Sequence, residues 1–228
     1  TERAAADARR PRAVWKPLDG APTARPAGAW LVLLPATGPG TVAAGLPDAL
    51  GLHAVRVTTD GRDRTGLADL LRELPSPDGG FTGVLSLLAL GTDDSDSDDP
   101  AGLGGVLPTA TAVQALGDAG IHAPLWILTR QAVTTGRADR LVHPGQAAAR
   151  GLLRVAALEH PERRFGAVDL PEDLDTRAVR RLAHLLAEPG EESDLAVRAS
   201  ATYARRLVHH PAPEGAAPRR FAPEGTTL

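Results

Sequence analysis

The chain has 228 residues, 43% of them hydrophobic, and a formal net charge of −3 at pH 7, so it can bury a sizeable core in one large domain or two small ones. Acidic and basic residues are mixed along it, which leaves no electrostatic footprint for nucleic acid. It has no cysteine, which excludes disulfides, thiolate nucleophiles and cysteine-ligated metals. With no signal-peptide pattern and no apolar run long enough for a bilayer, we expect a cytoplasmic protein without membrane contact.

Short apolar runs alternate with helical patterns along the chain. Residues 1–27 are predicted to form a linker that contains a short edge strand over 12–17. Further strands are predicted at 29–34, 53–58, 83–88, 124–129, 165–170 and 194–198, and helices at 65–73, 104–119, 144–159 and 175–188. Strands that are apolar throughout and alternate with helices indicate a mostly parallel sheet with helices on both faces.

Several boundaries carry physical signals. Pro144 suits the first turn of a helix and Pro161 ends the same helix, while Asp175 can cap the next one. The segment "AVRASATYARRLVHH" breaks the alternation, because two strand-like runs flank "AS". This pattern predicts an antiparallel hairpin at the edge of the sheet.

The stretch "LVLLPATGPGTVAAGL" resembles a nucleotide-binding turn. Gly38, Gly40 and Ala43 have the spacing G-x-G-x-x-A after an apolar run, and Asp60 follows twenty residues after Gly40 at the end of a second apolar run. In a dinucleotide-binding fold such a loop holds the pyrophosphate and the acidic residue binds the ribose.

Other residues argue against a working phosphate site. The helix after the loop should present its N-terminus to the phosphates, but Pro47 would break it and Gly45 adds a further cost. Pro39 lacks an N–H that a phosphate would use. The sequence therefore favours a structural turn, with a nucleotide site that uses Gly38, Gly40 and Asp60 as the alternative.

Catalytic groups of a nicotinamide-dependent reductase are not recognisable. A short-chain reductase needs a Tyr with a Lys four residues later on a helix, so that the ammonium lowers the phenol pKa. The sole tyrosine is Tyr203 and the sole lysine is Lys16. The helix where the pair would lie offers only Arg150 and Arg154, which we expect to face solvent or a partner surface.

The acidic run "TDDSDSDDP" (92–100) imitates the start of a calcium loop through Asp94, Asp96 and Asp98. The sixth position is Asp99 where a Gly is needed, and the twelfth is Gly105 where a bidentate Glu is needed. We therefore predict a solvated loop and no metal site.

Residues 124–171 contain "PLWILTRQAV", "QAAARGLLRVAALEHPE" and "GAVDLP" in this order. They resemble the ketoreductase domains of modular type I polyketide synthases, and "RAVWKP", "GVLSLLAL" and "AVRASATYARRLV" extend the resemblance over roughly 12–228. One departure is Arg150-Gly151, where many relatives carry a Trp-Gly pair.

The resemblance implies the first, structural half of a ketoreductase, with a truncated Rossmann-like fold over 28–210 and no catalytic residue. Residues 211–228 would be a linker and the start of the strand that leads into the catalytic half. That second half would carry NADPH and reduce β-ketoacyl chains on an acyl carrier protein. The partners implied for this chain are the catalytic half, the neighbouring synthase domains and the carrier protein.

Overall fold

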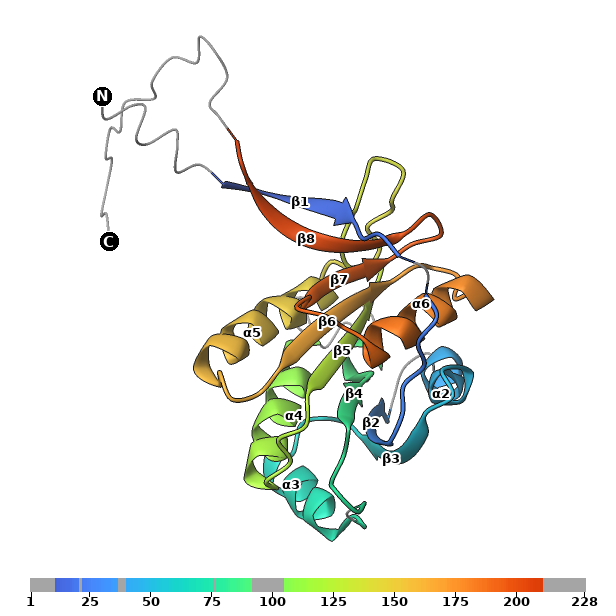
Figure 1. The fold of residues 1–228 in the computed structure, drawn as a ribbon. Coiled ribbons are helices and arrows are strands. Elements are labelled where there is room, and N and C mark those ends of the chain that lie inside the picture. Colours follow the sequence, from blue (N-terminus) through green and yellow to red (C-terminus); the bar gives the residue numbers. More distant parts are fainter. Residues whose placement is uncertain (1–10, 21, 37–39, 76, 92–104, 211–228) are drawn as a thin grey trace, which may run out of the picture. The chain divides into compact units, whose positions relative to one another are not determined.

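The computed structural model describes residues 11–20, 22–36, 40–75, 77–91 and 105–210, and strands alternate with helices along most of this length (Figure 1). The strands are β1 (Pro11–Pro17), β2 (Ala29–Pro35), β3 (His53–Thr59), β4 (Gly83–Ser86), β5 (Leu125–Arg130), β6 (Phe165–Leu170), β7 (Asp194–Val197) and β8 (Thr202–His209). The helices are α2 (Gly40–Ala49), α3 (Arg64–Glu73), α4 (Val106–Asp118), α5 (Gln146–Glu159) and α6 (Thr176–Ala187), with a short 3-10 helix, η1 (Leu88–Gly91).

The described strands form one eight-stranded sheet in the order β1-β8-β7-β6-β5-β4-β2-β3. All neighbours from β3 to β7 are parallel, and β8 runs antiparallel to β7. The order reverses between β2 and β4, as in doubly wound folds, but only β3 lies beyond β2 where the dinucleotide-binding order has two strands. The predicted α/β, truncated Rossmann-like fold with an antiparallel edge hairpin is therefore confirmed.

The chain divides into two compact units. The larger unit, residues 15–204, contains the described helices and the core. The smaller unit comprises residues 1–14 and 205–228, and its described part is the outer ends of β1 and β8.

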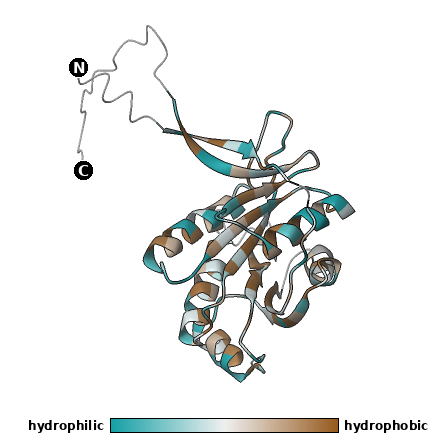
Figure 2. Cartoon of the chain, in the orientation of Figure 1, coloured by the Kyte–Doolittle hydropathy of each residue, from teal (hydrophilic) through white to brown (hydrophobic). Residues whose placement is uncertain are grey.

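The sheet of the larger unit has a core on each face. Successive residues of β2 point to opposite faces, so Trp30 and Val32 belong to one core and Leu31 and Leu33 to the other. Helices α2 and α6 supply the first core, and α3, α4 and α5 the second (Figure 1). Hydrophobic residues are concentrated on the central strands (Figure 2), as expected for a parallel sheet covered on both faces.

Two tryptophans each lie over a glycine of the neighbouring strand. Trp30 on β2 is paired with Gly83 on β4, and Trp126 on β5 with Gly166 on β6. A Cβ at Gly83 would come within 2.6 Å of the Trp30 ring, and one at Gly166 would overlap the Trp126 ring. Both glycines are therefore needed for the close approach of an aromatic ring.

Helix α2 corrects one step of the sequence reasoning, because it forms with Pro47 inside it. Ala43, Leu46 and Leu50 of this segment are buried in the core. Beyond Pro47 the chain closes with hydrogen bonds from Leu50 N to Leu46 O (3.0 Å) and from Leu52 N to Pro47 O (3.0 Å). Burial of an apolar face outweighs the local cost of a proline near the helix end.

Two further predicted boundaries differ from those in the structure, and one predicted helix cap is present. The strand predicted over 83–88 ends at Ser86, where the chain turns into η1. Pro144 lies in a turn before α5 instead of in its first turn, and α5 begins at Gln146. Asp175 caps α6 as predicted, since its Oδ1 accepts a hydrogen bond from Ala178 N at 2.7 Å.

Candidate functional site

The predicted nucleotide loop follows β2 at the carboxyl edge of the sheet. Gly38 lies outside the described residues, whereas Gly40 is the first residue of α2. Asp60 follows β3 directly, and the ends of β2 and β3 are in register, with Pro35 opposite Thr59. The start of α2 and Asp60 therefore lie at the same edge of the sheet.

The turn at Asp60 is closed on itself. Asp60 is exposed, and its Oδ1 accepts a hydrogen bond from Arg62 N at 2.9 Å. Gly61 has a φ of 67°, and a Cβ there would come within 2.5 Å of Pro108 in the first turn of α4. The acidic side chain thus stabilises its own turn, and α4 packs directly against that turn.

The switch point between β2 and β4 is where ligands bind in doubly wound folds. Here Leu87 N donates to Leu33 O at 2.9 Å, and the chain continues into η1, whose residues 88–90 are buried. Gly105, at the N-terminus of α4, lies within van der Waals distance of Ala89. In the described part of this edge, apolar side chains occupy the space beyond β4.

A buried carboxylate organises the carboxyl ends of β5 and β6. Asp169 is fully buried, and its Oδ1 accepts hydrogen bonds from Thr129 Oγ1 (2.7 Å) and Ala132 N (2.9 Å). Its Oδ2 accepts from Arg198 Nη2 at 2.7 Å. A buried charge is tolerated when it is paired and hydrogen-bonded in this way.

Arg198 extends this network to the segment after β5. Its Nε donates to Asp139 Oδ2 at 2.6 Å and its Nη2 to Val133 O at 2.8 Å. Burial opposes the charged form of Asp139, but hydrogen bonds from Thr135 N–H and from the Arg198 guanidinium outweigh it and hold the pKa of Asp139 below its ordinary value. These hydrogen bonds hold the segment 131–143 at the carboxyl ends of β5 and β6.

The structure also corrects the expectation for Arg150, which is 1% exposed instead of facing solvent. Its Nη2 donates to Asp194 Oδ1 at 2.5 Å and its Nη1 to Thr129 Oγ1 at 3.2 Å. The guanidinium also lies 5.8 Å from the centre of the Trp15 ring. Arg154 is half-exposed and pairs with the same carboxylate at 3.2 Å.

Sequence reasoning missed these buried ions because their partners are far apart in the chain. A signal was present, since Asp169 is the one charged residue in the otherwise apolar β6 and Arg198 directly follows the apolar run Leu195–Val197 of β7. The sole tyrosine, Tyr203, lies on β8 with its hydroxyl 2.9 Å from Ser200 Oγ, and the sole lysine, Lys16, is exposed on β1. Neither lies on a helix.

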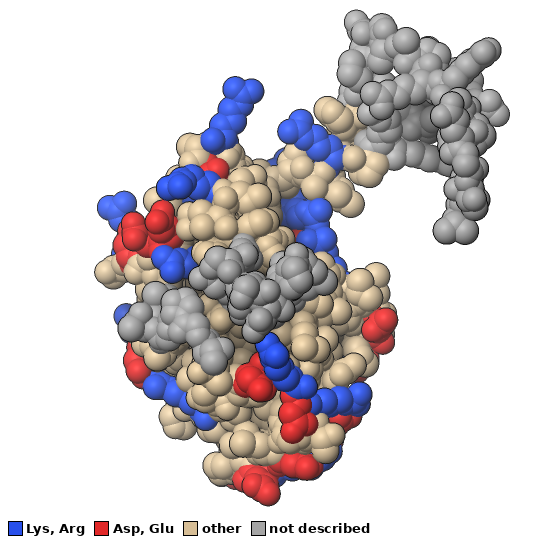
Figure 3. Space-filling model, turned by 180° about the vertical axis from the view of Figure 1, so that it is seen from behind, with Lys and Arg blue, Asp and Glu red and all other residues tan. Residues whose placement is uncertain are grey.

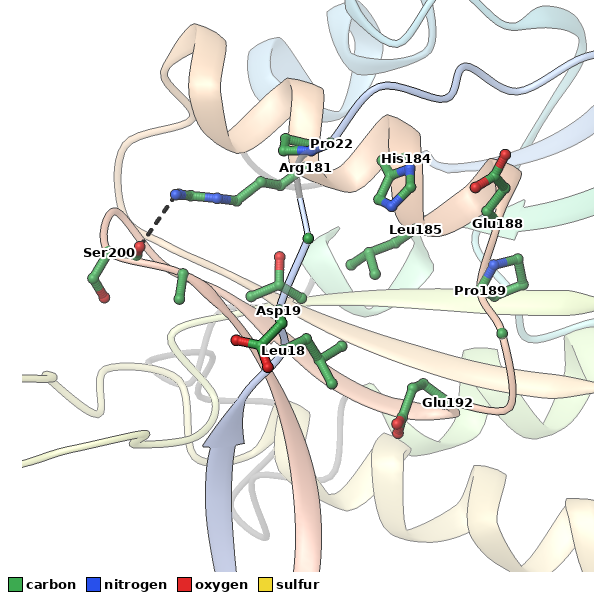
Figure 4. A pocket seen from close by; sticks show the side chains of 14 residues that line it. Leu18, Asp19, Pro22, Arg181, His184, Leu185, Glu188, Pro189, Glu192 and Ser200 are labelled. Carbon is green, nitrogen blue, oxygen red and sulfur yellow. Dashed lines mark hydrogen bonds between the residues drawn. The ribbon is translucent and has the colours of Figure 1, made fainter.

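A pocket of about 330 Å³ lies between α6, the segment after β1 and the turn between β7 and β8 (Figure 4). Arg181 points toward this turn and donates to the carbonyls of Arg198 (2.6 Å) and Ala199 (2.8 Å). His184 Nδ1 accepts from Ala24 N at 3.4 Å. These polar groups connect α6 to the linker and to the hairpin.

A second pocket, of about 360 Å³, lies before the amino ends of β4 and β5, between the C-terminal ends of α3 and α4 and the glycine turn that precedes β4. Arg72 at its rim donates to Asp118 O at 2.9 Å. Arg181 in the first pocket and Arg72 in the second therefore both donate hydrogen bonds to backbone carbonyls.

Within the described part of the chain, no group of His, Asp and Glu side chains could hold a metal ion, and the loop predicted over 92–100 lies outside that part. None of the described helices combines the length and hydropathy needed to cross a bilayer. On the face seen in Figure 3, acidic and basic side chains are interspersed.

Together these features define a Rossmann-like domain with a truncated, doubly wound sheet. Residues 13–207 match the family described as the Rossmann fold domain of the polyketide synthase extender module SpnB. The chain belongs to this family, which is the Rossmann part of modular polyketide synthase ketoreductase domains.

Two relatives illustrate the match. The chain is 46% identical over 207 residues to polyketide synthase GfsA of Streptomyces halstedii, a match that covers 89% of this chain and 3% of that protein. It is 41% identical over 226 residues to the pikromycin polyketide synthase component PikAIII of Streptomyces venezuelae, covering 98% of this chain and 13% of that protein.

Solved structures agree with these relatives. An A-type ketoreductase from a modular polyketide synthase matches with a TM-score of 0.79 and 43% identity, over 94% of this chain and 45% of that one. A C2-type ketoreductase matches with a TM-score of 0.78 and 42% identity, over 91% and 44%. The chain thus spans less than half of these ketoreductases and a small share of the synthases.

Proposed function

We propose that this chain is the structural, noncatalytic half of a polyketide synthase ketoreductase. It scaffolds a second half that binds NADPH and reduces β-ketoacyl chains carried on an acyl carrier protein. The extent of the match supports this division, because the match covers 94% of this chain but only 45% of an A-type ketoreductase.

The observation that carries the proposal is which polar side chains α5 carries and what they bind. A short-chain reductase needs its Tyr and Lys on the corresponding helix. Here that helix presents Arg150 and Arg154, and both side chains are held by Asp194. The polar groups of α5 stabilise its packing against β7, which is a structural role.

Three features of the sequence and of the described residues argue against a dinucleotide at the carboxyl edge of the sheet. Asp60 caps its own turn, η1 occupies the edge beyond β4, and Pro39 has no N–H to offer a phosphate. The proposal therefore assigns no coenzyme, metal or catalytic residue to this chain, and places NADPH on the other half.

One observation favours the alternative, an autonomous nucleotide-binding protein that uses the 38–43 loop. Helix α2 does form, and its N-terminus at Gly40 lies at the carboxyl edge of the sheet, where helix N-termini bind phosphates. Asp60 at the same edge would then bind a ribose hydroxyl.

The proposed role also defines partners and boundaries. Residues 28–210 form the structural subdomain, and 211–228 lead into the catalytic half. The catalytic half is the direct partner, and neighbouring synthase domains and the carrier protein are partners within the module, in the cytoplasm. No nucleic acid or membrane takes part.

Substitution of Asp60 in the full ketoreductase separates the two functions. Under the proposed function, Asp60→Ala leaves the NADPH dissociation constant unchanged within about twofold, as does the control Asp69→Ala on α3, which is also exposed. A tenfold weakening, about 1.4 kcal/mol, with an unchanged melting temperature would establish the 38–43 loop and Asp60 as a nucleotide site and refute the proposal.

A further inference from the structure

The segment 131–143, between β5 and α5, forms a closed loop at the carboxyl edge of the sheet (Figure 1). Gln131 O accepts hydrogen bonds from Val142 N (3.0 Å) and from His143 N (3.1 Å), which join the two ends of the segment. Compact loops with joined ends are often functional, and α/β folds carry their binding loops at the carboxyl ends of the strands. We call residues 131–143 the β5–α5 loop.

The β5–α5 loop is held in one conformation by its own polar groups. Asp139 Oδ2 accepts hydrogen bonds from Thr135 N (2.9 Å) and Thr135 Oγ1 (3.0 Å), besides the one from Arg198 Nε. Gln131 is buried and has a φ of 47°, the one positive φ of a described residue other than glycine. This backbone conformation is strained in a residue with a side chain and persists only where its surroundings fix it. The loop therefore presents a fixed outer surface.

That outer surface combines two apolar side chains with two positive charges. Leu141 is 52% and Val142 is 40% exposed, and they are the only consecutive pair among the exposed large hydrophobic residues of the described chain. Arg137 and Arg140 are exposed beside them. The ion pairs of the described residues include neither arginine. Asp139, the one acidic residue of the loop, is turned inward by its hydrogen bonds, so the outward charge is positive.

This combination indicates the kind of partner that the loop fits. Surfaces that associate transiently are small, with apolar side chains at the centre, a polar rim and an enrichment in Arg. Permanent interfaces are larger and more apolar. Two guanidinium groups next to apolar side chains fit a surface on which carboxylates flank an apolar patch, because opposite charges steer the encounter and fix its orientation.

We infer that the β5–α5 loop is a docking site for an acidic surface of a synthase domain outside the ketoreductase, which contacts the loop transiently. This inference rests on the proposed function, because it takes the chain as part of a synthase. In the relatives GfsA and PikAIII the matched region makes up 3% and 13% of the protein, so most of each protein lies outside it. A domain tethered in the same polypeptide has a high effective concentration and needs only a small charged patch.

Photo-cross-linking in the synthase polypeptide that contains this chain tests the inference. A benzophenone amino acid replaces Leu141, and Ala138, which is exposed on the same loop, is the second position. We expect cross-links to acidic peptides of a domain outside the ketoreductase, with a yield that falls at least about fivefold between about 0.05 M and about 0.5 M NaCl. Cross-links confined to residues 1–228, to the second half of the ketoreductase or to a second copy of the chain would overturn the inference. So would the absence of cross-links at both positions.

Charge reversal tests the role of the two arginines. Arg137→Glu/Arg140→Glu should lower the cross-link yield at least about tenfold, because like charges then face each other. The matched control is Arg177→Glu/Arg180→Glu, which reverses two exposed charges at the same spacing on α6. The control should leave the yield unchanged within about twofold. Equal yields in the two double variants, at equal melting temperatures, would overturn the inference.

The proposed function is tested separately, by titration of NADPH into residues 1–228. If residues 1–228 bind no coenzyme and the loop gives no cross-link, only the docking site is refuted.

Discussion

At the scale of single residues, an ion pair between Arg150 and Asp194 joins α5 to the start of β7, beside the apolar contacts that α5 makes through Ala149, Leu153 and Ala156. Arg150 is almost fully buried, while Asp194 retains 14% exposure and a second partner in Arg154. Such pairs contribute little net stability compared with apolar packing, but the loss of one member leaves a buried charge unpaired. The two arginines of α5 should therefore differ sharply in their effect on stability.

We predict that Arg150→Ala lowers the free energy of unfolding by about 3 kcal/mol. Arg154→Ala, the matched control four residues later, should cost less than about 1 kcal/mol because its side chain is half-exposed. Urea denaturation followed by tryptophan fluorescence measures both. Equal losses of unfolding free energy in the two variants would contradict a buried, stabilising position for the Arg150 side chain.

At the scale of elements, the close fit between neighbouring strands depends on glycines beneath tryptophan rings. Because the Trp126 ring lies directly over Gly166, Gly166→Ala should overpack the core and lower the free energy of unfolding by about 2 to 3 kcal/mol. Gly136→Ala is the control, since a Cβ there meets no atom within 4 Å. A melting temperature for Gly166→Ala equal to that of the control would refute this account of the sheet.

The elements also show what the sequence can reveal. Apolar runs such as 29–34 and 165–170 predicted β2 and β6 to within one residue, because strands buried on both faces are apolar along most of their length. Helix α2 could not be predicted, because local rules count the cost of Pro47 and the compensating burial is a tertiary effect. The same holds for Arg150, whose partner is 44 residues away.

The candidate site was predictable in position more than in chemistry. The spacing of Gly40 and Asp60 identifies the edge of the sheet where α2 begins and β3 ends. The hydrogen bond from Arg62 N to Asp60 is local, whereas the packing of Pro108 against Gly61 is a tertiary contact that the local sequence does not encode.

At the scale of the whole molecule, the central claim is that this Rossmann-like domain supports a reductase without binding its coenzyme. The sheet, the switch point and the helix after β2 keep the arrangement of a dinucleotide-binding fold. Structural groups occupy the places where chemistry would be expected, with η1 beyond β4 and the buried arginine on α5.

Titration of NADPH into residues 1–228 by calorimetry tests this claim most directly, with the full ketoreductase as the positive control. We predict no saturable binding by residues 1–228, with a dissociation constant weaker than about 1 mM, or less than about 4 kcal/mol of binding free energy. The full ketoreductase should bind in the micromolar range under the same conditions. Micromolar binding by residues 1–228 alone would contradict the account.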